Sequence, residues 1–140
     1  MSALKGFSRL YCDASFFVAL FSKADRMHRR ARSLFKEIVE EEIRLITAWP
    51  VVGEAMTVLR YHYGYRSALT FNNSLDFYHI LSPTENHYHQ AVAVFNIQNK
   101  AHAISFVDGL SYILITTELD EIPCLSFDSD FKKLGLTVIR

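Results

Sequence analysis

The sequence predicts an α/β fold in which helices cover both faces of a central parallel sheet, a three-layer α/β/α architecture. Short apolar segments that favour strands alternate along the chain with longer segments of helical periodicity. The strand segments are apolar on both faces, as in strands buried between two helical layers. The 140 residues suffice for one core, and neither a linker nor an internal repeat interrupts them. We therefore expect a single domain over residues 1–140.

Five short segments rich in aliphatic and aromatic residues are predicted strands, and they span residues 9–12, 44–47, 77–81, 123–127 and 136–139. Helices are predicted between them at residues 14–23, 27–42, 50–64, 66–76, 84–100 and 105–119, with one helical turn within 128–135. Asp13 precedes the first helix at the position of an N-cap, Pro50 suits a first helical turn, and Gly64 is expected to end the helix that Pro50 begins.

Composition excludes several classes of protein. Fifteen Lys and Arg residues balance fifteen Asp and Glu residues, so a broadly basic surface for nucleic acid is excluded. The apolar run at 16–21 is far shorter than a membrane span, and residues 1–10 lack the features of a secretion signal. We expect a cytoplasmic protein in which Cys12 and Cys124, both in apolar segments, are reduced and buried. The absence of CxxC and HExxH patterns argues against a zinc site.

Acidic residues occur where the predicted strands end and the following helices begin. Asp13 closes the first strand, and Asp128 and Asp130 follow the strand at 123–127. Asp108 falls in the first turn of the helix at 105–119, and Glu54 lies in the first half of the helix at 50–64. Helix starts and strand ends share one edge of a parallel sheet, where ligands gather. These five carboxylates are therefore expected to converge.

Each acidic residue also has a purely structural explanation. Asp13 caps a helix, Ser105 and Asp108 match a capping box, and the DSD sequence favours a turn. Glu54 pairs with a helical arginine, although its apolar neighbours make an unpaired charge costly. These explanations account for the residues one at a time, and none of them requires a common edge.

A group of carboxylates without Lys or Arg in the same motifs repels itself unless cations neutralise it. Ligands that are all oxygen select Mg²⁺ or Mn²⁺ over Zn²⁺. Such ions acidify water and stabilise the charge that develops when a phosphodiester is attacked. The acidic residues therefore point to metal-assisted phosphodiester hydrolysis.

Four sequence motifs occur in series along the chain: YCDAS at 11–15, Thr47 followed by Glu54, SFVD at 105–108, and SFDSDF preceding LG within 126–135. Together they resemble the PIN domain family, and in particular its VapC-type ribonuclease toxins. The resemblance implies a PIN-like α/β/α fold, a Mg²⁺- or Mn²⁺-dependent endoribonuclease, a homodimer, and inhibition by a small antitoxin protein.

Carried over by motif, the resemblance assigns metal-binding and catalytic roles to Asp13, Glu54 and Asp108, with either Asp128 or Asp130 as the fourth acid. Ser15 occupies the hydroxyl position of the first motif, where it hydrogen-bonds an aspartate or a water. Gly109 stands where alanine is more usual, and a residue this small is not expected to block the site.

Two further segments carry groups that suit RNA. Residues 23–36 hold six of the fifteen basic residues. Three roles are open for this segment: binding RNA phosphates, forming a solvated helix face, or contacting an antitoxin. For the sequence YHYGYR at 61–66 the alternatives are stacking on bases and packing at a helix end or dimer surface. No catalytic role is assigned to the six histidines. Two alternatives to a toxin remain: a PIN nuclease of RNA processing without an antitoxin, and a non-catalytic α/β binding module in which the acids are caps.

Overall fold

A computed structural model describes residues 4–140; residues 1–3, part of the segment in which no secretion signal is expected, lie outside the described part. Its centre is a five-stranded sheet in which every pairing is parallel, with the order β3-β2-β1-β4-β5. The strands are β1 (Arg9–Cys12), β2 (Arg44–Ala48), β3 (His79–Leu81), β4 (Cys124–Leu125) and β5 (Val138–Ile139).

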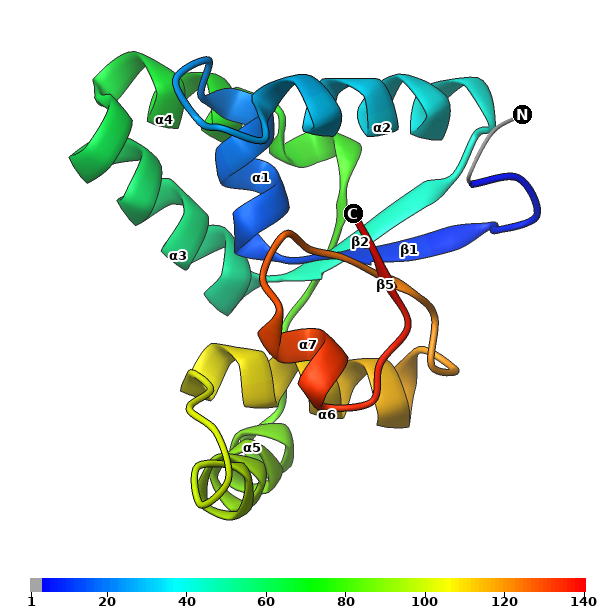
Figure 1. Cartoon of the computed structure of the whole chain (residues 1–140), viewed down its shortest axis with the longest axis vertical. Coiled ribbons are helices and arrows are strands. Elements are labelled where there is room, and N and C mark those ends of the chain that lie inside the picture. Colours follow the sequence, from blue (N-terminus) through cyan, green and yellow to red (C-terminus); the bar gives the residue numbers. More distant parts are fainter. Residues whose placement is uncertain (1–3) are drawn as a thin grey trace.

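Helices cover both faces of this sheet (Figure 1). One face carries α1 (Ala14–Phe21), α2 (His28–Glu40), α3 (Trp49–Val58) and α4 (Tyr65–Asn73). The other carries α5 (Glu85–Gln98), α6 (Phe106–Glu118) and the short α7 (Asp130–Lys133). Two further turns are a π-helix, η1 (Leu59–Tyr63), and a 3₁₀ helix, η2 (Leu75–Phe77). The predicted three-layer α/β/α fold is confirmed.

The apolar strands and helix faces form a continuous core that fills the α1 side of the sheet and reaches α6 and α7. Phe17 of α1 is fully buried, and its ring centroid lies 5.1 Å from that of Phe71 and 4.9 Å from that of Tyr78. Burying aromatic rings of this size contributes much of the stability of a small domain. Because α1 is anchored in this way, Asp13 at its start is held in a fixed place.

Several element boundaries differ from those predicted from sequence. The segment 77–81 forms a strand only from His79, because η2 occupies the residues before it. The strand predicted at 123–127 ends at Leu125, where Ser126 accepts a hydrogen bond from the N–H of Asp128 at 3.0 Å and turns the chain. The last strand is likewise confined to two residues, Val138–Ile139.

The helix predicted at 50–64 begins as α3 and finishes as the π-helix η1. The N–H of Gly64 bonds the carbonyl of Leu59 at 2.9 Å, which is the wider spacing of a π turn. Gly64 ends the segment as predicted, and its φ of 106° is a conformation that glycine adopts without strain.

Cys12 and Cys124 are both buried free thiols, as predicted. Within residues 4–140, the longest apolar helices remain too short to cross a membrane.

Candidate active site

The candidate site lies where the order of strands reverses. Strand β1 is central: the chain adds β2 on one side of it and later β4 on the other. In an open parallel sheet, the loops that leave such a pair of strands diverge and open a crevice at their carboxyl ends. Asp13 follows β1 and lines this crevice, and Ser126 follows β4 and is fully buried.

Asp13 is almost completely buried and has its hydrogen bonds concentrated on one oxygen. Its Oδ2 accepts bonds from the N–H of Ser15 at 3.3 Å, the hydroxyl of Ser15 at 2.9 Å and the hydroxyl of Ser126 at 3.0 Å. Burial raises the pKa of Asp13, and the two hydroxyl bonds partly oppose that rise. Asp13 therefore caps α1, as its structural explanation proposes, and also lies in the crevice.

Ser15 and Ser126 join the ends of β1 and β4. Besides bonding Asp13, Ser15 accepts the N–H of Phe127 at 2.9 Å, while Ser126 accepts the N–H of Asp128 at 3.0 Å. The hydrogen bond predicted for Ser15 is thus present. Ser126 was not singled out by the sequence argument, although it opens the SFDSDF motif. Together the two hydroxyls fix the DSD turn against Asp13.

Two buried hydrogen bonds made by hydroxyl groups hold the surrounding elements in register. Thr47 of β2 donates to the carbonyl of Cys12, directly before the buried aspartate, at 2.9 Å. The hydroxyls of Tyr11 on β1 and Ser111 on α6 lie 2.8 Å apart. Because Ser111 is nearly one turn after Asp108, this bond sets the position of Asp108 relative to β1.

Asp108 is 6% exposed and belongs to a complete capping box. Its Oδ2 accepts the N–H of Ser105 at 3.2 Å, and its own N–H donates to the hydroxyl of Ser105 at 3.0 Å. Burial, with a further contribution from the charges of Asp13 and Asp128, raises the pKa of Asp108 to about 7. The hydrogen bonds of the capping box lower the pKa of Asp108 but do not cancel this rise, because the burial and the neighbouring carboxylates remain.

Three carboxylates meet in the crevice at the distance of ligands that share an ion. One oxygen each of Asp108, Asp128 and Asp130 lie within 4.8 Å of one another. Asp128 also accepts the N–H of Asp130 at 2.9 Å, so the predicted turn in DSD is present. Burial, followed by the charge of Asp130, raises the pKa of Asp128. Asp128 and Asp130 both belong to this group of three carboxylates, whereas the sequence left open which of the two is the fourth acid.

One lysine lies close to the clustered carboxylates. Lys133, three residues after Asp130 on the short α7, places its Nζ 3.4 Å from Oδ1 of that aspartate. This cation, just outside the SFDSDF motif, offsets part of the repulsion between the carboxylates. Lys133 is half-exposed, and exposed pairs of this kind contribute little energy.

Glu54 lies on the solvent side of α3, contrary to the expectation that it sits among apolar side chains. Its neighbours Val52 and Ala55 are buried, whereas Glu54 is exposed and lines the crevice. Partial desolvation, and then the charges of Asp13 and Asp128, raise its pKa. The Glu54 carboxylate is therefore only partly desolvated, and it remains within the electrostatic field of the other acids.

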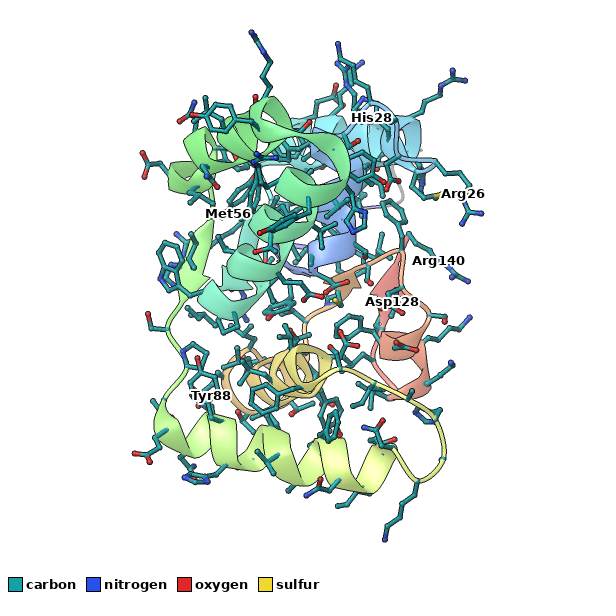
Figure 2. The ribbon with its side chains drawn as sticks, turned by 90° about the vertical axis from the view of Figure 1, so that its left-hand side faces the viewer. Arg26, His28, Met56, Tyr88, Asp128 and Arg140 are labelled. Carbon is teal, nitrogen blue, oxygen red and sulfur yellow. The ribbon has the colours of Figure 1, made fainter. Side chains whose placement is uncertain are left out.

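The crevice is a cleft of about 940 Å³ that all six predicted site residues line: Asp13, Ser15, Glu54, Asp108, Asp128 and Asp130. Three lining residues that the sequence argument did not place there are Asp25, His62 and Tyr63. Of the basic segment 23–36, Arg26 lines this cleft, on the same side of the molecule as Asp128 (Figure 2).

The donor set of the cleft fits a hard divalent cation. The three clustered ligand atoms are all carboxylate oxygens, and the group contains neither Cys nor His. Mg²⁺ and Mn²⁺ prefer such ligands, whereas Zn²⁺ favours nitrogen and sulfur. The raised pKa values of Asp108 and Asp128 show that their charged forms are unfavourable in the cleft, and a bound cation would favour those charged forms.

The fold is shared with several solved structures. VapC20 of Mycobacterium tuberculosis, described as a sarcin–ricin loop cleaving toxin, is 24% identical, with a TM-score of 0.81 over 94% of this chain and 98% of that chain. A toxin–antitoxin complex from Klebsiella pneumoniae is 13% identical, with a TM-score of 0.64 over 94% and 96%. FitAcB from Neisseria gonorrhoeae is also 13% identical, with a TM-score of 0.62 over the same shares.

No curated protein sequence matches the chain. The family model of the PIN domain matches residues 10–136, which include most of β1, all of β2, β3 and β4, and all of the clustered acids. The chain therefore belongs to the PIN domain family.

Proposed function

We propose that this protein is a Mg²⁺- or Mn²⁺-dependent endoribonuclease and the toxin of a toxin–antitoxin pair. The observation that carries the proposal is the convergence of Asp108, Asp128 and Asp130 within 4.8 Å, in the crevice of a PIN domain. Two of the similar structures are described as a toxin and as a toxin–antitoxin complex, which favours a toxin over a nuclease of RNA processing.

In this proposal the three clustered aspartates hold the cation, and Asp13 and Glu54 complete its acidic surroundings. A divalent cation supplies charge neutralisation for a phosphodiester and acidifies water. Asp13 is held still by the hydroxyls of Ser15 and Ser126, so its carboxylate needs no reorganisation. Glu54 is exposed in the cleft with a raised pKa, which suits a group that takes a proton from attacking water.

Incubation of the purified protein with total RNA tests the nuclease. We expect cleavage with Mg²⁺ or Mn²⁺, none with EDTA, and none from an Asp108→Asn variant that retains the folded circular dichroism spectrum. Sequencing of the cut ends then identifies the RNA and the cleavage site. Equal cleavage by the Asp108→Asn variant would contradict the proposed site.

Expression in a bacterial host tests the toxin. Growth should stop on induction of the wild type and continue on induction of the Asp13→Asn variant. A small protein encoded beside the gene should relieve the arrest and bind the toxin. A wild type that cleaves RNA but does not affect growth would favour the alternative of an RNA-processing nuclease.

We propose that the protein forms a homodimer through the outer face of α5. Val92 and Phe95, three positions apart on this helix, are 47% and 37% exposed, which is costly for apolar groups in water. Light scattering should give the mass of two chains, and Val92→Lys should give the mass of one. A wild type that is monomeric at high concentration would contradict this part of the proposal.

A further inference from the structure

The π-helix η1 presents aromatic side chains to solvent. Tyr61 and Tyr63 are 81% and 36% exposed, and Tyr65 just beyond the turn is 63% exposed. Exposed aromatic rings forfeit the burial that normally stabilises them. A π turn is also much rarer than an α-helix and is often found at functional sites. Both features call for an explanation that packing does not supply.

The π turn places two of its rings at the acidic cleft. Glu54, Val58 and His62 are spaced four apart along α3 and η1, and all three line the cleft. Tyr63 follows immediately and lines it too. The ring centroids of His62 and Tyr63 lie 6.5 Å apart. Tyr61, on the same turn, lines neither this cleft nor the second groove described next.

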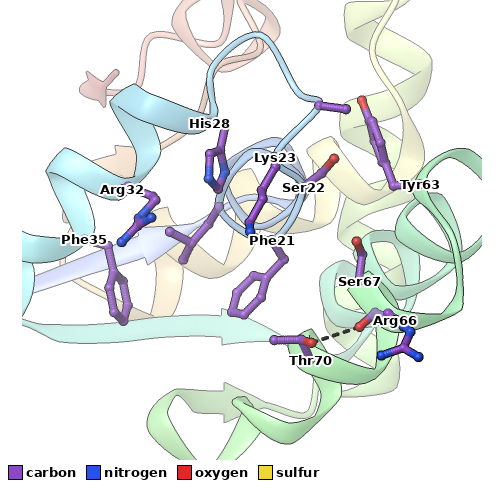
Figure 3. Close-up of a pocket in the computed structure, with 12 residues that line it drawn as sticks. Phe21, Ser22, Lys23, His28, Arg32, Phe35, Tyr63, Arg66, Ser67 and Thr70 are labelled. Atoms are coloured by element: carbon purple, nitrogen blue, oxygen red, sulfur yellow. Dashed lines mark hydrogen bonds between the residues drawn. The ribbon is translucent and has the colours of Figure 1, made fainter.

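Tyr63 also lines a second groove, between α1, α2 and α4. This groove, of about 710 Å³, contains the side chains of Lys23, His28, Arg32 and Arg66. Its lining includes no aspartate or glutamate. Figure 3 shows Tyr63 beyond Ser22 and Lys23, at the end of the groove away from Phe35. The tyrosine therefore stands where a cation-binding cleft meets a basic groove.

Asp25 keeps Tyr63 in this place. Its Oδ1 accepts the N–H of Met27 at 2.8 Å, which fixes the loop after α1, and its Oδ2 accepts the hydroxyl of Tyr63 at 3.4 Å. The ring is thus tethered by its polar end while part of its surface stays open.

We propose that Tyr63 is the stacking platform for one unpaired nucleobase next to the cleaved phosphodiester, with the ring of His62 inclined at 55° beside it, and that the RNA strand continues into the basic groove. The inference rests on the proposed nuclease function. A single ligand that fills both grooves must present anions to the cation site and again to Lys23 and Arg32. A nucleic acid strand does so with every nucleotide, and its bases offer flat faces to Tyr63 between the phosphates.

Three variants test the platform on a short single-stranded RNA that contains the mapped cut site. Tyr63→Leu removes the aromatic face and should lower kcat/KM about 10-fold, whereas Tyr63→Phe keeps the face, loses only the hydroxyl bond to Asp25, and should lower kcat/KM less than Tyr63→Leu does. Tyr61→Leu is the matched control on the same turn and should be unaffected. Replacing the neighbouring nucleotide by an abasic one should slow the wild type and leave Tyr63→Leu unchanged. Equal rates for Tyr63→Leu and Tyr61→Leu would overturn the platform.

A binding measurement separates this inference from the nuclease activity. In an Asp108→Asn background, anisotropy of a fluorescently labelled RNA strand should show about 10-fold weaker binding with Tyr63→Leu. Replacing Arg32 and Arg66 by alanine should weaken binding and reduce the salt slope by about 1.4, since each phosphate contact on a single strand contributes about 0.7.

The outcomes are distinct. RNA binding that depends on Tyr63 in a protein that never cleaves RNA would refute the proposed function and leave the platform standing. Cleavage by the wild type that ignores Tyr63 would refute the platform alone. Arginine variants that bind RNA normally but lose an acidic protein partner would show that the basic groove receives protein, which overturns the proposed path of the strand.

Discussion

Replacing Asp108 by asparagine should stabilise the protein above neutral pH when divalent cations are absent. The pKa of Asp108 is about 7, compared with its ordinary value of 3.8, because the carboxyl is buried near Asp13 and Asp128. Asparagine has nearly the same shape, and its side-chain oxygen still accepts the N–H of Ser105. The substitution therefore removes the charge while keeping that half of the capping box.

The sign follows from proton binding in the two states. Between about pH 4 and about pH 7 the folded protein retains a proton on Asp108 that the unfolded chain releases, so the free energy of unfolding falls as pH rises. A difference of about three pH units corresponds to on the order of 4 kcal/mol. The loss is complete above the folded pKa of about 7 and absent below the ordinary value of 3.8. The asparagine variant escapes it.

Urea unfolding at several pH values, in EDTA and in Mg²⁺, measures this effect. In EDTA the variant should exceed the wild type by up to about 4 kcal/mol at about pH 8, and the difference should shrink towards about pH 4. Mg²⁺ at 100 times its Kd should stabilise the wild type by about 2.7 kcal/mol and the variant by less. Parallel pH dependence for both proteins in EDTA would refute the reasoning, because Asp108 would then be an ordinary cap.

Three further predictions follow from the site and its supports. Asp13→Asn and Glu54→Gln should each lower metal-dependent RNA cleavage about 100-fold or more while circular dichroism remains that of the wild type; a fully active variant would exclude its residue from the site. Ser126→Ala removes a bond to Asp13 and should cost about 10–100-fold in cleavage or in Mg²⁺ affinity by calorimetry, so an unchanged affinity and rate would contradict its positioning role. Gly109→Ala places a Cβ 3.3 Å from the carbonyl oxygen of Ala91 and should destabilise the packing of α5 on α6 by about 1–3 kcal/mol in thermal unfolding. An unchanged stability would contradict this prediction, because α5 and α6 would then move apart at no cost.

The alternation of strands and helices could be predicted because it depends on local patterns. Segments such as 9–12 and 44–47 are apolar on both faces, and only strands between two helical layers require that pattern. Gly64 ends its helix as predicted, since the conformation needed there favours glycine. The order of strands in the sheet could not be predicted in this way, because the sequence of an apolar strand does not indicate which strand lies beside it.

The shared edge of the acids was also predictable. Asp13 follows a strand and Asp108 begins a helix, and in a parallel sheet these ends point the same way. The capping roles of both residues were visible in the same motifs. Capping and convergence both hold in the structure, so the two explanations were never exclusive.

The distances within the site belong to the tertiary structure. Sequence places Glu54 among apolar residues, but the rotation of α3 turns its side chain into the cleft. Sequence does not show that Ser126 reaches across from β4 to Asp13, or that η1 widens into a π turn that brings Tyr63 to the junction of two grooves. Local patterns determined which elements form and which residues lie at their ends, because the formation of a helix or strand depends mainly on residues close to it along the chain. Packing alone decided which of those residues meet, because contacts between segments a hundred residues apart depend on the order and rotation of elements that no local pattern records.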